Sequence, residues 1–119
     1  MDTQAIAREF VALCQAGQFA EAGERFWADD VVSIEAMGPV PVSTGIAAVR
    51  GKSEWWYANH EIHGATAAGP YVNGDQFAVR FSIDVTMRAS GQRMAMEEVG
   101  LYTLRDGKIV EERFFFGIG

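Results

Sequence analysis

Two amphipathic segments open the chain. Between residues 3 and 16 apolar side chains recur at helical spacing, and Gly17 marks the expected end of a helix. The apolar positions of this first segment are Ile6, Phe10, Leu13 and Cys14. A second helix is predicted to follow, because Phe19, Ala22, Phe26 and Trp27 again share one face. Each predicted helix therefore needs a partner surface.

Most of the remaining chain has the pattern of β-strands. Residues 31–36 predict a first strand, residues 37–45 are rich in glycine and proline and predict a loop, and a third helix is expected to start near Ser53. Residues 62–72 are only weakly strand-like, whereas residues 76–88 alternate strictly between apolar and polar side chains. Strands over 94–104 and 109–116 complete the pattern. Helices followed by an antiparallel sheet predict an α+β fold, with the helices packed on one sheet face.

The last two strands are joined by Asp106-Gly107, which is a strong signal for a two-residue hairpin loop. This loop pairs Arg105 with Lys108. Further along, it pairs Glu97 with Phe116. One face would then carry Glu97, Val99, Leu101, Glu112 and Phe114. A single β-bulge would exchange the faces and turn Glu98 inward instead, so both glutamates remain candidates for a buried site.

Composition and charge narrow the classes of partner. The 119 residues suit one domain over 1–119. The net charge of −6 does not attract phosphate backbones or anionic lipids, so no nucleic acid partner is expected. No apolar run of about 18 residues and no signal peptide are found, so no membrane association is expected. The single cysteine, Cys14, excludes an intrachain disulfide and favours a cytoplasmic setting.

Several segments occur in an order that points to a known family: WADDVVSIEA at 27–36, a GPVPV-type loop, GKSEWW at 51–56 and DGKIVEERFFF at 106–116. Over nearly its whole length the chain resembles the SnoaL-like branch of the nuclear transport factor 2-like superfamily. The resemblance implies a strongly curved sheet wrapped around helices as a cone with a deep pocket, usually in a homodimer. Ketosteroid isomerases, polyketide cyclases, limonene epoxide hydrolases, dehydratases and noncatalytic binding proteins share this fold, so it does not fix the function.

The resemblance can be carried over residue by residue. Glu35 takes the place of the catalytic base of ketosteroid isomerases, whereas their tyrosine donor falls at Phe10, which has no hydroxyl. Their second acid falls near Val99 or Gly100, just after Glu97 and Glu98. The Asp–Arg–Asp set of epoxide hydrolases is matched only by Asp84, since serine and phenylalanine occupy the two other places.

Three candidate catalytic residues follow: Glu35, His60 and Asp84. In a pocket, lost hydration would make Glu35 a usable general base near neutral pH, and the alternative is a solvated acid at a strand end. His60 shares a helical face with Trp56 and could shuttle protons, or simply bond to the helix backbone. Asp84 could enter the pocket or lie on the water-facing side of its strand.

Metal and cofactor sites are not expected. His60 and His63 are three residues apart, whereas a zinc-binding HExxH helix needs a spacing of four, and the chain has one cysteine. No glycine-rich phosphate loop is present. The chemistry must then come from side chains alone.

The sequence therefore predicts a small-molecule pocket protein, and two classes of function stay open. One is a cofactor-free acid–base enzyme, an isomerase, cyclase or hydratase, acting on an apolar polycyclic or terpenoid-like compound. The other is a noncatalytic ligand-binding or dimerisation module. The expected ligand contacts are Phe10, Trp56, Glu97, Glu98, Glu112 and Phe114. A homodimer is expected as well, because the apolar face of residues 77–87 is too long to stay exposed if the opposite face lines the pocket.

Overall fold

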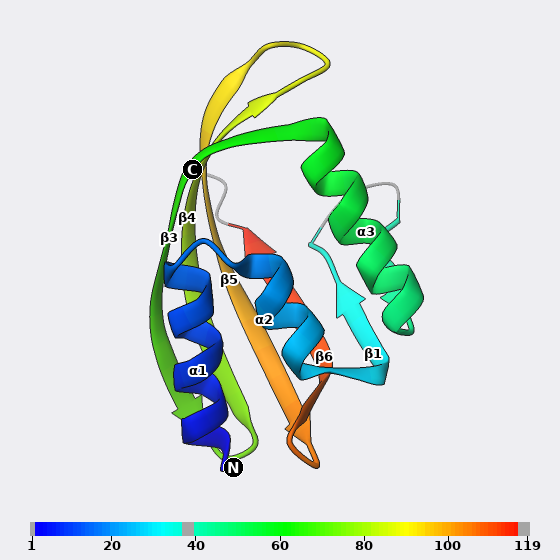
Figure 1. Cartoon of the computed structure of the whole chain (residues 1–119), viewed down its shortest axis with the longest axis vertical. Helices are drawn as coiled ribbons and strands as arrows, with labels where there is room; N and C mark the ends of the chain where they lie inside the picture. The colour runs from blue at the N-terminus through cyan, green and yellow to red at the C-terminus, as the bar shows by residue number, and fades with distance from the viewer. Residues whose placement is uncertain (1, 37–39, 117–119) are drawn as a thin grey trace.

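The computed structural model describes residues 2–36 and 40–116. Within these residues the elements are α1 (Thr3–Gln15), α2 (Phe19–Phe26), β1 (Trp27–Ile34), β2 (Val42–Thr44), α3 (Ile46–Asn59), β3 (His60–Asn73), β4 (Gln76–Met87), β5 (Arg93–Arg105) and β6 (Lys108–Phe116). The strands form one sheet in the order β2-β1-β6-β5-β4-β3. Helices α1 and α2 lie against one face of this sheet, and α3 lies beside β1 (Figure 1). The predicted α+β fold is confirmed. No helix among these elements is long and apolar enough to cross a membrane.

The segment between β1 and α3 differs from the prediction. Helix α3 begins at Ile46 rather than near Ser53, because Gly45 turns the chain with a φ of 89° and its carbonyl oxygen accepts a hydrogen bond from the Val49 amide. Within the expected loop, Val42–Thr44 forms the short strand β2, which pairs with β1. Residues 37–39 of that loop lie outside the described residues.

Two further corrections concern strand pairing. The sheet is not purely antiparallel, because β1 lies parallel to β6, so the first and last strands of the chain are neighbours. The weakly strand-like segment is the continuous strand β3, and its register shifts twice, at 62–64 and at 68–71. These irregularities explain why the sequence of β3 lacks clean alternation.

The core lies between the helices and the inner face of the sheet, which is the face that the helices cover. Phe10 of α1 is buried against the rings of Phe26, Phe77 and Tyr102. The apolar face of β4 belongs to this core, with Phe77, Val79, Phe81 and Val85 all buried. The expectation that this face forms a dimer surface is therefore wrong, because the helices of the same chain already cover it.

The last hairpin contains the bulge that would exchange its faces. Arg105 lies opposite Lys108 as predicted, but the register shifts between Thr103 and Leu104. Glu98, rather than Glu97, therefore lies opposite Phe116. Glu98 is turned inward, and Glu97 is exposed on the outer face, where it pairs with Arg80.

Gly23 and Gly51 provide a matched test of helix packing. A Cβ atom at position 23 would lie 2.4 Å from the Trp27 ring, whereas one at position 51 would meet nothing within 4 Å. We expect Gly51→Ala to raise the free energy of unfolding by up to about 1 kcal/mol through helix propensity. Gly23→Ala should lower it, because the indole must move. Urea denaturation followed by circular dichroism checks both, and a stabilised Gly23→Ala variant would contradict the packing described.

Candidate functional site

The inner face of the sheet carries its side chains in rows that run across neighbouring strands. From β4 through β5 and β6 to β1, the first row holds Phe77, Tyr102, Glu112 and Ser33. The second row holds Val79, Gly100 and Phe114, and the third holds Phe81, Glu98 and Phe116. Since successive rows are two residues apart along each strand, all these positions share one face. Two carboxyl groups therefore lie among aromatic side chains.

Glu35 joins this face from the end of β1 and forms an ion pair with α3. Its Oε1 atom lies 2.8 Å from Nζ of Lys52, which also bonds to the Ser33 hydroxyl. Lys52 Nζ lies 5.2 Å from the centre of the Phe114 ring. The side chains of Glu35 and Lys52 are 25% and 21% exposed, so water still reaches this pair.

Glu98 differs sharply from an ordinary surface acid. Its pKa is raised from 4.5 to about 7. Burial is the largest cause, the charges of Glu35 and Glu112 also raise the pKa, and Lys52 lowers it. The flanking rings of Phe81 and Phe116 explain why the carboxyl is poorly hydrated. At neutral pH a large share of Glu98 is therefore protonated, although it lies within the influence of a lysine.

Glu112 completes a set that we call the glutamate cluster: Glu35, Glu98 and Glu112 with Lys52. Glu112 is only 6% exposed, and burial raises its pKa, whereas Lys52 and a hydrogen bond from Ser33 lower it. The charge of Glu35 raises the pKa of both Glu98 and Glu112, and Lys52 lowers both. The cluster thus combines a buried carboxyl at Glu112 with a partly hydrated ion pair between Glu35 and Lys52, and it can hold and exchange protons.

Two neutral groups border the glutamate cluster. Burial, and then the charge of Glu112, raise the pKa of the Cys14 thiol to about 12. The pKa of Tyr102 is raised well above its usual value, first by burial and then by Glu112 and the other nearby acids. Both groups keep their protons at physiological pH.

The other predicted site residues lie elsewhere. Asp84 is on the outer face of β4, where Arg93 binds both of its oxygens at 3.0 and 2.7 Å and lowers its pKa. This corrects the expectation that Asp84 shares a pocket with Glu35. His60 follows the end of α3; its Nδ1 lies 2.8 Å from the Trp56 carbonyl oxygen and its ring stacks on Trp56. These contacts do not join His60 to the glutamate cluster.

The predicted ligand contacts divide in the same way. Glu98, Glu112 and Phe114 lie together on the inner face, whereas Glu97 faces outward. Phe10 is buried in the core against Tyr102. Trp56 is half-buried on α3 beside His60.

Comparison with known proteins identifies the family. A family model described as a SnoaL-like domain matches residues 1–116. The chain belongs to the SnoaL-like family. A protein from Mesorhizobium loti with a crystal structure is 55% identical in sequence. It is provisionally described as a SnoaL-like polyketide cyclase and also as a carbohydrate phosphatase. The match covers 98% of this chain and 100% of that chain, with a TM-score of 0.95.

More distant structures share the fold of this SnoaL-like domain. A Bacillus subtilis protein provisionally described as an isomerase is 20% identical, with 98% and 90% of the two chains covered and a TM-score of 0.78. A Jannaschia protein provisionally described as a SnoaL-like polyketide cyclase is 18% identical, with 93% and 85% covered and a TM-score of 0.75. Comparison with curated proteins finds no match.

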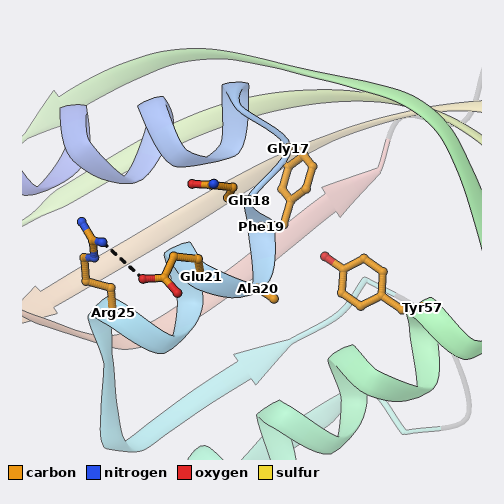
Figure 2. A pocket seen from close by; sticks show the side chains of 7 residues that line it. All are labelled: Gly17, Gln18, Phe19, Ala20, Glu21, Arg25 and Tyr57. Atoms are coloured by element: carbon orange, nitrogen blue, oxygen red, sulfur yellow. Dashed lines mark hydrogen bonds and ion pairs between the residues drawn. The ribbon is translucent and has the colours of Figure 1, made fainter.

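Two surface hollows of the SnoaL-like domain lie along the gap between α2 and α3. The larger is open and measures about 720 Å³. It is lined by the turn before α2, by residues along α2 including Arg25, and by Tyr57 of α3. Figure 2 shows its lining side chains, with the rings of Phe19 from α2 and Tyr57 from α3 among them. The smaller, of about 160 Å³, also includes Tyr57. Neither lining includes a glutamate of the cluster, so hollows and cluster are separate features.

The site contains residues that sequence reasoning did not select. Lys52, Ser33 and Tyr102 were not among the candidates, although Lys52 lies in the GKSEWW segment. Within residues 2–36 and 40–116, no group of three or more possible metal ligands is close enough to hold an ion. The ion-paired Glu35 and the Glu98 carboxyl of raised pKa suit proton transfer, with Lys52 as the compensating cation.

The raised pKa of Glu98 predicts how stability depends on pH. Glu98 binds its proton more tightly in the folded chain, so its contribution is fully present below pH 4.5 and is lost as pH rises through about 7. Glu98→Gln should therefore resemble the parent at pH 4 and be more stable at pH 8.5, by up to about 3 kcal/mol.

The matched control for this prediction is Glu97→Gln. Glu97 is the neighbouring acid on the exposed outer face, so its removal should leave the pH profile almost unchanged. Urea denaturation at a series of pH values measures both variants. Equal profiles for Glu98→Gln and the parent would show that Glu98 is not held in its protonated form.

Proposed function

We propose that this SnoaL-like domain is a cofactor-free enzyme that moves protons on a small apolar molecule through the glutamate cluster. The observation that carries the proposal is Glu98, whose pKa of about 7 lets it hold a proton near the ion-paired Glu35. An acid and a base with different surroundings can act at the same pH. Glu35 is the proposed general base and Glu98 the proposed general acid.

The proposed reaction begins at a carbon next to a carbonyl group. Glu35 takes a proton from this carbon while Glu98 gives its proton to the carbonyl oxygen, which yields an enol. Return of a proton to another carbon gives an isomer, and attack of the enol carbon on a second carbonyl group gives a ring. Glu35 is neutralised by the proton from the substrate carbon, while Glu98 becomes charged when it gives its own proton to the carbonyl oxygen. The net charge beside Lys52 therefore stays constant, which limits the electrostatic cost.

The charge of the glutamate cluster and the aromatic rings beside it favour a neutral, apolar substrate. Three glutamates near one lysine disfavour a phosphate ester, so the phosphatase wording used for the Mesorhizobium loti protein has no support in this site. The rings of Phe114 and Phe116 beside the glutamates suit an apolar surface. A polycyclic or terpenoid-like ketone fits both properties.

Hydrogen–deuterium exchange tests proton removal without knowledge of the product. A panel of neutral cyclic ketones is incubated with the protein in D₂O, and incorporation of deuterium beside the carbonyl group is followed by NMR. We expect exchange with the parent protein and a loss of at least about 100-fold in Glu35→Gln, because a general base typically contributes this much. Binding of the same ketones should persist in Glu35→Gln, since its shape barely changes.

Glu97→Gln is again the control, because it removes an acid outside the glutamate cluster and should leave exchange unchanged. Equal exchange in Glu35→Gln and the parent would refute the role of Glu35. Ketone binding with no exchange by the parent would instead favour the noncatalytic binding module.

We also propose that the domain forms a homodimer through the outer face of the sheet. Val99 and Phe115 lie opposite each other on β5 and β6 and are 36% and 50% exposed. Tyr71 of β3 is 65% exposed. These side chains, rather than the buried face of β4, supply the apolar surface. A cytoplasmic location remains a prediction from the single cysteine.

Light scattering at micromolar concentration tests the assembly. We expect a particle of twice the 13.0 kDa chain mass. Phe115→Glu should dissociate it, because a charge would be buried in the interface. Trp55→Glu, at an exposed ring on α3, is the control and should remain dimeric. A monomeric parent protein would contradict the proposal.

A further inference from the structure

The ring of Tyr102 is fixed in place from three sides. It lies 4.7 Å from the ring of Phe10 on α1 and is stacked on Phe77 of β4 at 5.0 Å. Phe114 of β6 meets it edge-on at 6.2 Å. Tyr102 is only 2% exposed. Its orientation is therefore set by packing with a helix and both neighbouring strands.

Gly100 provides the space that this orientation needs. A Cβ atom at position 100 would lie 2.8 Å from the Tyr102 hydroxyl oxygen and between 2.9 and 3.0 Å from two ring carbons. The side chain of Tyr102 thus lies across Gly100, two residues back along β5. Glu98 is two residues further back on the same face, so the phenol extends along the strand toward Glu98.

The surroundings of Glu98 come from several elements. Phe81 and Phe116 flank it on the neighbouring strands, and Gly100 with the overlying Tyr102 follows it along β5. The titratable and charged groups that act on it come from three other elements: Glu35 after β1, Lys52 on α3 and Glu112 on β6. From α1, Cys14 is buried beside Glu112 and stays neutral.

We propose that Tyr102 is a positioning residue for the acid Glu98: its ring, laid across Gly100, covers the side of the carboxyl that faces along β5 and excludes water there. The proposal rests on the proposed function for its importance to the reaction. Burial is the largest cause of the raised pKa of Glu98. The Tyr102 ring occupies space beside the carboxyl that water would otherwise fill, and it thereby keeps this pKa raised. Glycine is then required at position 100 because a side chain there would occupy the place of the Tyr102 ring, and not because the backbone needs a conformation that only glycine adopts.

The test is the titration of Glu98 itself, which needs no substrate. The protein is labelled with carboxyl-¹³C glutamate, and Glu98→Gln identifies the Glu98 signal by its disappearance. We expect Gly100→Ala to push the phenol aside and lower the titration midpoint of Glu98 by about one pH unit or more, since water regains access to the carboxylate. Tyr102→Leu should produce the same direction of shift, and serves if Gly100→Ala does not fold.

Two controls separate the ring from other effects. Gly64→Ala is a matched glycine substitution in β3, where a Cβ atom meets nothing within 4 Å, and should leave the midpoint unchanged. Tyr102→Phe keeps the ring and should also leave the midpoint near that of the parent. A shift in Tyr102→Phe as large as in Gly100→Ala would assign the effect to the hydroxyl and overturn the proposal. An unchanged midpoint in both Gly100→Ala and Tyr102→Leu would overturn it as well.

The outcome is independent of the ketone experiment. If the midpoint moves as expected but no ketone exchanges deuterium, Tyr102 controls the protonation of Glu98 and the proposed reaction is wrong. If exchange occurs but the midpoint stays fixed, the reaction stands and the role of Tyr102 is refuted.

Discussion

One extra residue in the last hairpin decides which side chains of β6 share the inner face with Glu98. The bulge between Thr103 and Leu104 shifts β5 by one position against β6, and side chains alternate between faces along a strand. Glu98 itself is turned inward by the regular pairing of β5 with β4, where it lies opposite the buried Phe81. Without the shift, its face would be shared by Glu111, Arg113 and Phe115 in place of Glu112, Phe114 and Phe116. The composition of the glutamate cluster therefore depends on this local irregularity.

Much of the fold could be predicted from the sequence because its strongest patterns are local. The helical spacing before Gly17, the alternation of β4 and the Asp106-Gly107 turn each specify one element from neighbouring residues. The parallel pairing of β1 with β6 has no such local pattern. Neither does the start of α3, a helix with only Val49 buried and therefore without a clear apolar face.

The site was predictable only in part, for the same reason. Glu35 could be selected through its family position and Glu112 through its face of the hairpin, but Lys52 depends on where α3 begins. For Asp84 both positions stayed open, because alternation alone does not say which face of β4 meets the helices; the apolar face meets them, so Asp84 lies on the outer side. Tyr102 has the pattern of an ordinary core residue, and only its orientation over Gly100 connects it with Glu98.

The parallel contact between β1 and β6 has a consequence for how the chain reaches its native state. Ser33 and Glu112 lie opposite each other in the sheet, although they come from the first third and the last tenth of the sequence. Contacts between such distant segments form late, since the loop between them must first close. During synthesis, β1 has no long partner strand until β6 has left the ribosome. The carboxyl groups around Lys52 therefore meet only once nearly the entire chain is available.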